Sequence, residues 1–245
     1  MNDVVLQASA IGVHRGGRII LQPTDFALRA GETVGIYGPN GAGKSTFLQA
    51  LAGLLPLSSG TIAVHGQVLG KDITAFAYHR RIAAVFQEPL LLRGTVAYNV
   101  ALGLALRGVG KAERAARIRP LLEQLKIDHL ADRSIGMISG GEAQRTSLAR
   151  ALVLDPDVLF LDEPFAALDQ PTRRRLVREL QDLLRGRRMA TVFVSHDFAE
   201  AAALCSRCAI LDGGAVLQDE PPGRLLERPR TSRVAEIIGL EDMPG

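Results

Sequence analysis

One short segment has the composition of a loop that binds phosphate groups. Three glycines within six residues are followed directly by a lysine and a serine, which fits the Walker A pattern without a mismatch. The glycines let the backbone curl so that successive amide groups face one anion. Lys44 adds a positive charge for the β- and γ-phosphates, and the Ser45 hydroxyl is a ligand for Mg²⁺. We predict that ATP is bound by Gly38, Pro39, Asn40, Gly41, Ala42, Gly43, Lys44, Ser45 and Thr46.

A pair of carboxylates, Asp162 and Glu163, ends the apolar run 158–161. Neighbouring side chains on a strand point to opposite sides, so the two acids can divide their work. We expect Asp162 to hold Mg²⁺ and Glu163 to deprotonate the attacking water, a role worth about 10²–10⁴-fold in rate. An acidic pair at a strand end is often only a pair of solvated residues. Its interpretation therefore depends on the phosphate loop in the same chain.

His196 follows a second apolar run, 190–194. In parallel sheets, ligands lie at the carboxyl ends of the strands, and a histidine there can hydrogen-bond a γ-phosphate and hold the water. The competing interpretation is an ordinary loop residue.

A second turn has the residues of an anion-binding site. Ser139, Gly140, Gly141 and Glu142 open a predicted helix, and helix N-termini attract phosphate. One nucleotide needs only one phosphate loop. We therefore expect the second turn to serve the ATP bound by another molecule.

These side chains must be positioned by strands that alternate with helices. Residues 33–37 are predicted as a strand before the phosphate loop, with a helix over 45–55 that Pro56 stops. Continuous apolar runs at 158–161 and 190–194, with a helix over 172–184 between them, indicate a parallel sheet wrapped by helices. Residues 88–154 are expected to be almost wholly helical, with one helix over 112–125.

The predicted fold class is therefore α/β. It combines a P-loop NTPase core with a mainly parallel sheet, an N-terminal antiparallel β region and an inserted helical subdomain. The predicted boundaries are 1–87 and 155–220 for the core, 88–154 for the helical subdomain and 221–245 for a C-terminal helical tail.

The motifs together resemble those of the ATP-binding cassette (ABC) ATPases over nearly the whole chain. The family's order is Walker A at 38–45, a glutamine loop at Gln87, the signature at 139–142, Walker B at 159–163, the D-loop at 167–169 and a switch histidine at His196. The resemblance implies that two chains pack head to tail around two ATP molecules. Gln87 would then ligate Mg²⁺ and act in catalysis beside Glu163, His196 and Lys44, and Asp169 of the D-loop would lie at the nucleotide.

The chain departs from the family pattern at a few positions. Ile138 replaces the usual leucine of the signature, and Glu142 replaces the commoner glutamine. The aromatic residue that usually stacks on adenine is absent. His14 and Arg15 precede the turn Gly16-Gly17 instead, and either of them, or neither, would stack on the base.

Composition excludes several other classes. Hydrophobic residues make up 47% of the chain and the formal net charge is +3, which argues against disorder and gives no basis for nucleic-acid binding. The arginine clusters 173–175 and 185–188 are expected at solvated helix ends. Cys205 and Cys208 have the spacing of a redox or zinc half-site, but no second pair exists, and we expect both in the core.

No apolar stretch approaches the roughly 20 residues needed to cross a bilayer. The resemblance implies that a separate membrane permease binds the chain at the cytoplasmic face of the membrane. By the resemblance, an importer with an extracytoplasmic solute-binding protein is expected, with molybdate, tungstate or another oxyanion as the solute. The three leucines at 90–92 would form either a permease groove or part of the core. The alternative function is that of a soluble ABC ATPase without a transport role, which acts in assembly, in division or on nucleic acid or ribosomes.

Overall fold

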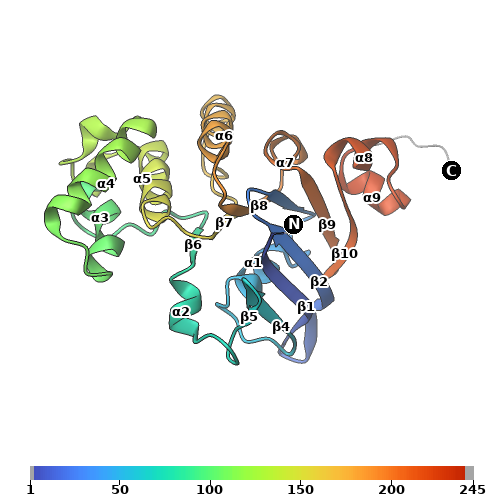
Figure 1. The fold of residues 1–245 in the computed structure, drawn as a ribbon. Coiled ribbons are helices and arrows are strands. Elements are labelled where there is room, and N and C mark those ends of the chain that lie inside the picture. Colours follow the sequence, from blue (N-terminus) through green and yellow to red (C-terminus); the bar gives the residue numbers. More distant parts are fainter. Residues whose placement is uncertain (1–2, 241–245) are drawn as a thin grey trace.

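Within residues 3–240, the part of the chain that the computed structural model describes, the strands form two sheets (Figure 1). The larger sheet has the order β10-β9-β3-β8-β7-β6 and is parallel except for β10, which runs antiparallel to β9. Every residue of β7 and β8 is buried, as expected for strands with helices on both faces. The strands are β3 (Thr33–Tyr37), β6 (Ile82–Val85), β7 (Val158–Asp162), β8 (Ala190–Ser195), β9 (Arg207–Asp212) and β10 (Ala215–Glu220).

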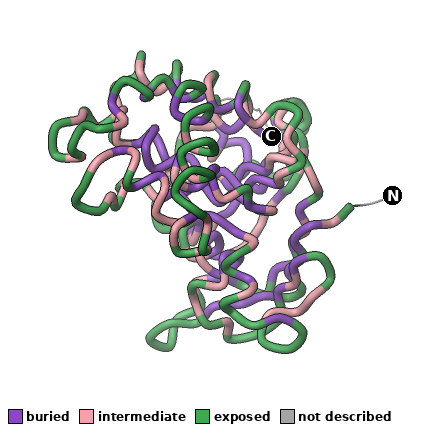
Figure 2. Tube along the Cα trace, turned by 60° about the vertical axis from the view of Figure 1, so that its left-hand side comes forward, coloured by how far each residue is buried: buried purple, intermediate pink, exposed green. Residues whose placement is uncertain are grey.

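The smaller sheet is antiparallel and has the order β2-β1-β4-β5. It consists of β1 (Val4–Arg15), β2 (Arg18–Arg29), β4 (Ser59–Val64) and β5 (Gln67–Val68). Helix α1 (Lys44–Leu51) contacts β1 and β2 as well as β7 and β8, so it lies between the two sheets. The two sheets and α1 share one core, in which Leu6, Leu28, Phe47 and Phe160 are fully buried. Figure 2 shows the buried parts of the chain concentrated in the centre of the molecule.

Helices inserted between β6 and β7 stand together on one side of the molecule (Figure 1). They are α3 (Val96–Leu106), α4 (Lys111–Gln124) and α5 (Gly140–Leu152), and the connection from α4 to α5 contains the short 3-10 turns η1 (Asp128–Leu130) and η2 (Ile135–Met137). Val100, Leu104, Leu122 and Leu148 form the core of this insertion.

The expectation of an almost wholly helical stretch from 88 to 154 is wrong at its start, because residues 88–95 form no helix. Pro89 has no amide hydrogen to donate to a helix. The buried side chain of Asn99 instead binds the backbone of Leu92 twice. Oδ1 of Asn99 accepts from the Leu92 amide at 2.8 Å, and Nδ2 donates to the Leu92 carbonyl oxygen at 2.9 Å. These hydrogen bonds fix the non-helical segment 88–95 on the insertion.

Helix α1 also ends earlier than predicted, at Leu51 rather than at 55. Gly53 takes a left-handed conformation with φ of 65° directly after the cap residue. A left-handed glycine ends a helix without steric cost, so Pro56 is not the residue that stops it. The remaining helices are α2 (Ala75–His79), α6 (Gln170–Leu184), α7 (Phe198–Leu204), α8 (Pro222–Glu227) and α9 (Ser232–Ile237).

The predicted α/β fold class, with its mainly parallel sheet, antiparallel N-terminal region and helical insertion, is confirmed. The two cysteines are both buried and free, as expected of core residues. Among residues 3–240, no helix combines the length and the apolar character that crossing a bilayer requires.

Candidate nucleotide-binding site

The carboxyl ends of three adjacent strands bring the predicted catalytic residues to one edge of the larger sheet. Tyr37 at the end of β3 pairs with Ser195 at the end of β8, and Asp162 at the end of β7 pairs with Val194. The phosphate loop, His196 and the two acids follow these strand ends directly. Strand order therefore gathers segments that are more than 100 residues apart in the sequence.

The phosphate loop leaves β3 and turns into α1 through Gly43, whose φ of 103° is unfavourable for any other residue type. A Cβ atom on Gly38 would lie 2.0 Å from the Leu211 carbonyl oxygen, so the loop is packed closely against β9. Lys44 is buried, and its Nζ donates to the carbonyl oxygens of Gly38 and Pro39 at 2.8 and 3.1 Å. Its charge therefore lies at the centre of the loop.

Two oxygen ligands lie side by side at the start of α1. The Ser45 hydroxyl donates to Oδ1 of Asp162 at 3.2 Å. Mg²⁺ prefers oxygen ligands and is usually held by one or two protein groups together with phosphates and water. The donor set fits this ion, because both side chains offer oxygen atoms, one from a hydroxyl and one from a carboxylate.

Glu163 and His196 contact each other directly. His196 Nδ1 lies 2.9 Å from Glu163 Oε2, and the Glu163 amide donates to the Val194 carbonyl at 3.1 Å. Glu163 has a φ of 45°, which is uncommon for a residue with a side chain and occurs mainly where function requires it. Because His196 uses Nδ1 for the hydrogen bond to Glu163, its Nε2 is left for another partner.

Burial shifts the pKa values of the basic and the acidic groups at this edge in opposite directions. It lowers the pKa of Lys44, although Glu163 and Asp162 act against that shift. Burial raises the pKa of Asp162, while the hydrogen bond from Ser45 lowers it and Glu163 raises it further. Both groups therefore lose favourable hydration in the charged state, and the cation and the acids stabilise each other.

Gln87 and Arg15 lie at the margins of this cluster. Gln87 is exposed two residues beyond the end of β6, whose Val85 pairs with Leu161. Arg15 is exposed at the tip of the β1–β2 hairpin. That hairpin adjoins the phosphate loop, because the Gln22 amide donates to Gly214 and the Gly214 amide donates to Ala42, at 2.8 and 3.0 Å. The described structure gives neither Gln87 nor Arg15 a side-chain hydrogen bond.

The signature residues 139–142 lie away from the phosphate loop, at the start of α5. Ser139 caps α5, and Glu142 accepts from both the amide and the hydroxyl of Ser139 in a capping box. Asp169 caps α6 by accepting from Thr172 at 3.0 Å. A cavity of about 550 Å³, here called the signature pocket, lies between these helix starts. It is lined by residues 139–142 and 167–169 with Lys126, Arg145, Thr172, Arg175 and Glu179.

Sequence reasoning placed all three arginines of the cluster 173–175 in solvent, and this is wrong for Arg173. Its side chain is largely buried, and it donates to the carbonyl oxygens of Ala166 and Leu168 at 2.9 and 3.3 Å. Arg173 therefore holds the D-loop in shape. Its place one helical turn after Asp169 was the available signal, since a side chain four residues along a helix can reach back to the preceding loop.

Sequence reasoning also missed a second neighbour of the phosphate loop. A cavity of about 350 Å³ is bounded by residues 37–40 and His196 on one side and by Arg233, Glu236 and Ile237 of α9 on the other. Arg233 donates to Asp212 at 2.7 Å and pairs with Glu236 at 2.9 Å. No motif marks this tail helix, so only the fold reveals that it borders the same cavity as the phosphate loop.

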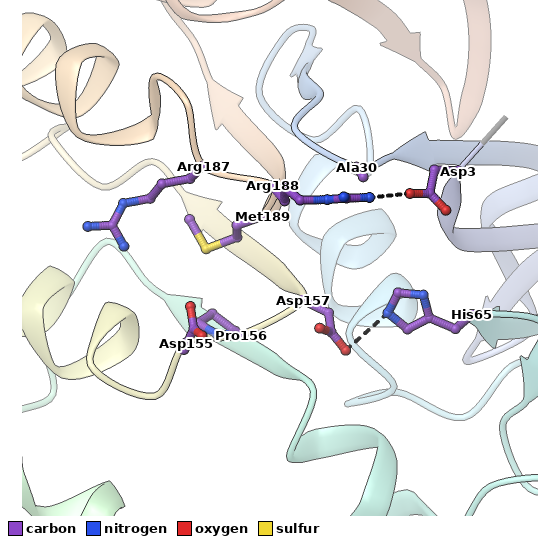
Figure 3. Close-up of a pocket in the computed structure, with 9 residues that line it drawn as sticks. All are labelled: Asp3, Ala30, His65, Asp155, Pro156, Asp157, Arg187, Arg188 and Met189. Atoms are coloured by element: carbon purple, nitrogen blue, oxygen red, sulfur yellow. Dashed lines mark hydrogen bonds and ion pairs between the residues drawn. The ribbon is translucent and has the colours of Figure 1, made fainter. Parts of the chain in front are cut away.

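Another cavity, of about 330 Å³, lies at the opposite edge of the larger sheet (Figure 3). Asp157 and Met189, which line it, precede β7 and β8, and His65 Nε2 lies 3.1 Å from Asp157 Oδ2. It contains none of the predicted site residues. Ligands of parallel sheets bind at the carboxyl ends, so this is not the nucleotide site.

Comparison with known proteins agrees with this geometry. The family model described as ABC transporter matches residues 21–166. The chain belongs to the ABC transporter family. Its members' ATP-binding subunits bind and hydrolyse ATP in support of transport, and this chain is such an ATPase.

Several relatives that match this ABC ATPase are import ATP-binding proteins. The Fe(3+) ions import ATP-binding protein of Streptomyces coelicolor is 38% identical over 99% of this chain and 69% of its own length. The sulfate/thiosulfate import ATP-binding protein of Methylococcus capsulatus is 40% identical over 89% of this chain and 64% of its own length. Relatives of comparable identity are named for molybdate/tungstate and for spermidine/putrescine.

A solved structure has the same fold. It is cbiO1 from Clostridium perfringens, described as part of the ABC transporter complex cbiONQ. It is 26% identical, covers 98% of this chain and 96% of its own, and superposes with a TM-score of 0.82.

Proposed function

We propose that this ABC ATPase energises the import of a solute through a separate membrane permease, working as a head-to-tail homodimer with two composite ATP sites. The observation that carries the dimer is the separation of the two phosphate-binding turns. The phosphate loop lies at the edge of the larger sheet, whereas the signature turn lines a pocket that contains no phosphate-loop residue. A second chain would supply the missing turn to each site.

In this proposal Gly38–Ser45 backbone amides and Lys44 bind the phosphates, and Thr46 and Arg15 complete the contacts of the holding chain. Ser139, Gly140, Gly141 and Glu142 of the second chain, with Asp169 of its D-loop, cover the nucleotide from the other side. Arg15 is the chosen adenine-stacking residue because its hairpin is hydrogen-bonded to the phosphate loop through Gly214. A guanidinium plane can stack on a base.

ATP hydrolysis would depend on Glu163 and His196, which follow the ends of β7 and β8. Glu163 orients and deprotonates the attacking water as general base. His196 fixes the Glu163 carboxylate through Nδ1 and presents Nε2 to the γ-phosphate. Ser45, Asp162 and Gln87 would hold Mg²⁺, which when bound supplies positive charge at the phosphates. Lys44 adds a second cation.

The segment 88–96 would receive the permease. Leu90 and Leu92 are 61% and 50% exposed, so their side chains are not core of the helical insertion, and exposed apolar patches mark interaction sites. The segment begins one residue after Gln87. A change at the nucleotide can therefore reach a partner on this surface, which would hold the chain peripherally at the cytoplasmic face of the membrane. An extracytoplasmic solute-binding protein would deliver the solute.

For the solute we propose an oxyanion such as molybdate, tungstate or sulfate. The support is sequence similarity to the sulfate/thiosulfate and molybdate/tungstate import proteins. Uptake by the purified complex in vesicles would test this with labelled sulfate and molybdate against Fe³⁺ and spermidine. Uptake of Fe³⁺ or spermidine in place of both oxyanions would overturn the solute class.

The composite site is tested by Ser139→Arg in a chain that also carries Glu163→Gln to prevent hydrolysis. We expect the bulky cation to block ATP-induced dimers on size-exclusion chromatography while a single chain still binds ATP. Ser232→Arg, an exposed serine in the first turn of α9, is the matched control. An undiminished ATP-induced dimer of the Ser139→Arg protein would reject the head-to-tail arrangement.

A further inference from the structure

The signature pocket is lined by charged residues in addition to the signature turn 139–142. Its carboxylates are all engaged locally. Glu142 accepts from Ser139 at 2.7 and 2.8 Å, and Asp169 accepts from Thr172 at 3.0 Å. Glu179 pairs with Arg145 at 2.6 Å and with Lys126 at 3.0 Å. The hydrogen bond from Thr172 lowers the pKa of Asp169, and the nearby positive charge of Arg175 lowers it further, so Asp169 and Arg175 attract each other without forming a hydrogen bond.

The cations of the pocket differ from one another. Arg145 and Lys126 both pair with Glu179, and Arg145 also donates to the Leu125 carbonyl at 2.8 Å. Arg175 is exposed and, within the described residues, makes no hydrogen bond or ion pair. It is therefore the one cation of the pocket, in the part of the chain described, whose donors are all available to a ligand.

Helix geometry directs Arg175 toward the signature turn. Thr172, Arg175 and Glu179 all line the pocket at spacings of three and four residues along α6. Leu176 and Leu180 occupy the buried face of the same helix. Arg175 thus lies on the wall of α6 that faces α5, across the pocket from Gly140 and Gly141.

We propose that Arg175 binds phosphate oxygens of the ATP held by the partner chain, as a contact additional to the signature turn. A guanidinium is always charged and presents a fork of donors that matches phosphate geometry. This inference rests on the proposed head-to-tail dimer. It adds a charged nucleotide contact on α6, so that the second chain grips the polyphosphate by a side-chain cation as well as by backbone amides.

Arg174 is a matched control within the same helix. It is exposed, adjacent in sequence and identical in charge, but it does not line the pocket. Loss of either arginine lowers the net charge of the chain equally. A difference between the two variants therefore reports the pocket and not general electrostatics.

The test uses the full chain with Glu163→Gln and measures the ATP concentration at half-maximal dimer formation. We expect Arg175→Ala to raise it by about 10-fold, consistent with loss of a charge-assisted contact. Arg174→Ala should leave it within about 2-fold, and Arg175→Lys should recover part of the loss. Thermal unfolding temperature and ATP binding by the single chain should not change, which separates a nucleotide contact from a structural role.

Two results would overturn the proposal in distinguishable ways. If the Glu163→Gln parent dimerises with ATP but Arg175→Ala behaves as Arg174→Ala does, the arginine contact is wrong and the head-to-tail dimer stands. If the parent binds ATP and never dimerises, the proposed dimer fails and the arginine contact fails with it.

Discussion

Nδ1 of His196 and Oε2 of Glu163 lie 2.9 Å apart and join the ends of β8 and β7. Glu163 also holds a left-handed backbone conformation, with its amide bonded to Val194. The carboxylate is thus oriented from two sides, by its own backbone and by the imidazole. Such an arrangement fixes a general base before the substrate binds.

Glu163→Gln should keep ATP binding and reduce hydrolysis by at least about 100-fold, because an amide cannot accept the proton of the attacking water. The side chain keeps its size, so the fold should not change. The rate of phosphate release measures the effect, and equilibrium ATP binding is the companion measurement. Glu227→Gln, an exposed glutamate of α8, is the control. Hydrolysis at the parental rate would exclude Glu163 as the base.

Lys44→Ala should weaken ATP binding by about 10- to 100-fold, the range expected for a lost hydrogen bond to a charged group. The lysine already lies inside the loop, bonded to Gly38 and Pro39. Binding titrations of the single chain measure this change. Lys71→Ala removes an exposed lysine of equal charge and should have no such effect. Equal affinities of the two variants would contradict the predicted role.

Asp162→Asn should stabilise the ligand-free chain at pH 7 while abolishing Mg²⁺-dependent hydrolysis. Burial raises the pKa of Asp162 above its ordinary value of 3.8. The stability that comes from protonating this group is complete below about pH 3.8 and is lost as the pH rises through the folded-state pKa. At pH 7 the wild type therefore buries a charge that the amide does not carry.

The measurement for this variant is the unfolding temperature as a function of pH. Each kcal/mol of relief raises it by roughly 2–4 °C in a chain of this length. The advantage of Asp162→Asn should shrink as the pH falls toward 4. Asp132→Asn, at an exposed aspartate, should give no comparable gain. A lower unfolding temperature of Asp162→Asn at pH 7 would contradict this reasoning.

The sequence predicts that Lys44, Asp162 and His196 lie together because each belongs to a motif that follows a strand end. Once β3, β7 and β8 are recognised as parallel strands, Lys44, Asp162 and His196 must meet at one edge. The predicted strand 33–37 and helix 172–184 are close to the observed β3 and α6, because the spacing of their apolar residues matches a strand and a helix.

Contacts made by single polar side chains could not be predicted in this way. Asn99 holds the non-helical segment before α3, and Arg173 holds the D-loop, through bonds to backbone carbonyls. Neither interaction leaves a periodic pattern, because it depends on which loop happens to lie within reach. Likewise, Arg233 lines a cavity together with residues of the phosphate loop only because the tail helix folds back.

Gly35→Ala should destabilise the chain by about 1–3 kcal/mol, the usual cost of overpacking a core. Gly35 lies in the centre of β3, one position before Ile36. A Cβ atom there would lie 2.9 Å from Cys208 Sγ and 3.2 Å from Cys205 Sγ. Because β3 is paired on both sides, by β8 and β9, the strand cannot move away to relieve the contact.

The double variant Gly35→Ala, Cys208→Ala separates this packing from any redox role of the cysteines. Removing the Cys208 sulfur frees the space that the new methyl group needs, so the two substitutions should be less destabilising together than the sum of their separate effects. Gly223→Ala is the control, because no atom lies within 4 Å of its added Cβ. Chemical denaturation under reducing conditions measures all four variants. Strict additivity of the double variant would show that the Cys208 sulfur does not restrict Gly35, and that Cys208 needs an explanation other than packing against this glycine.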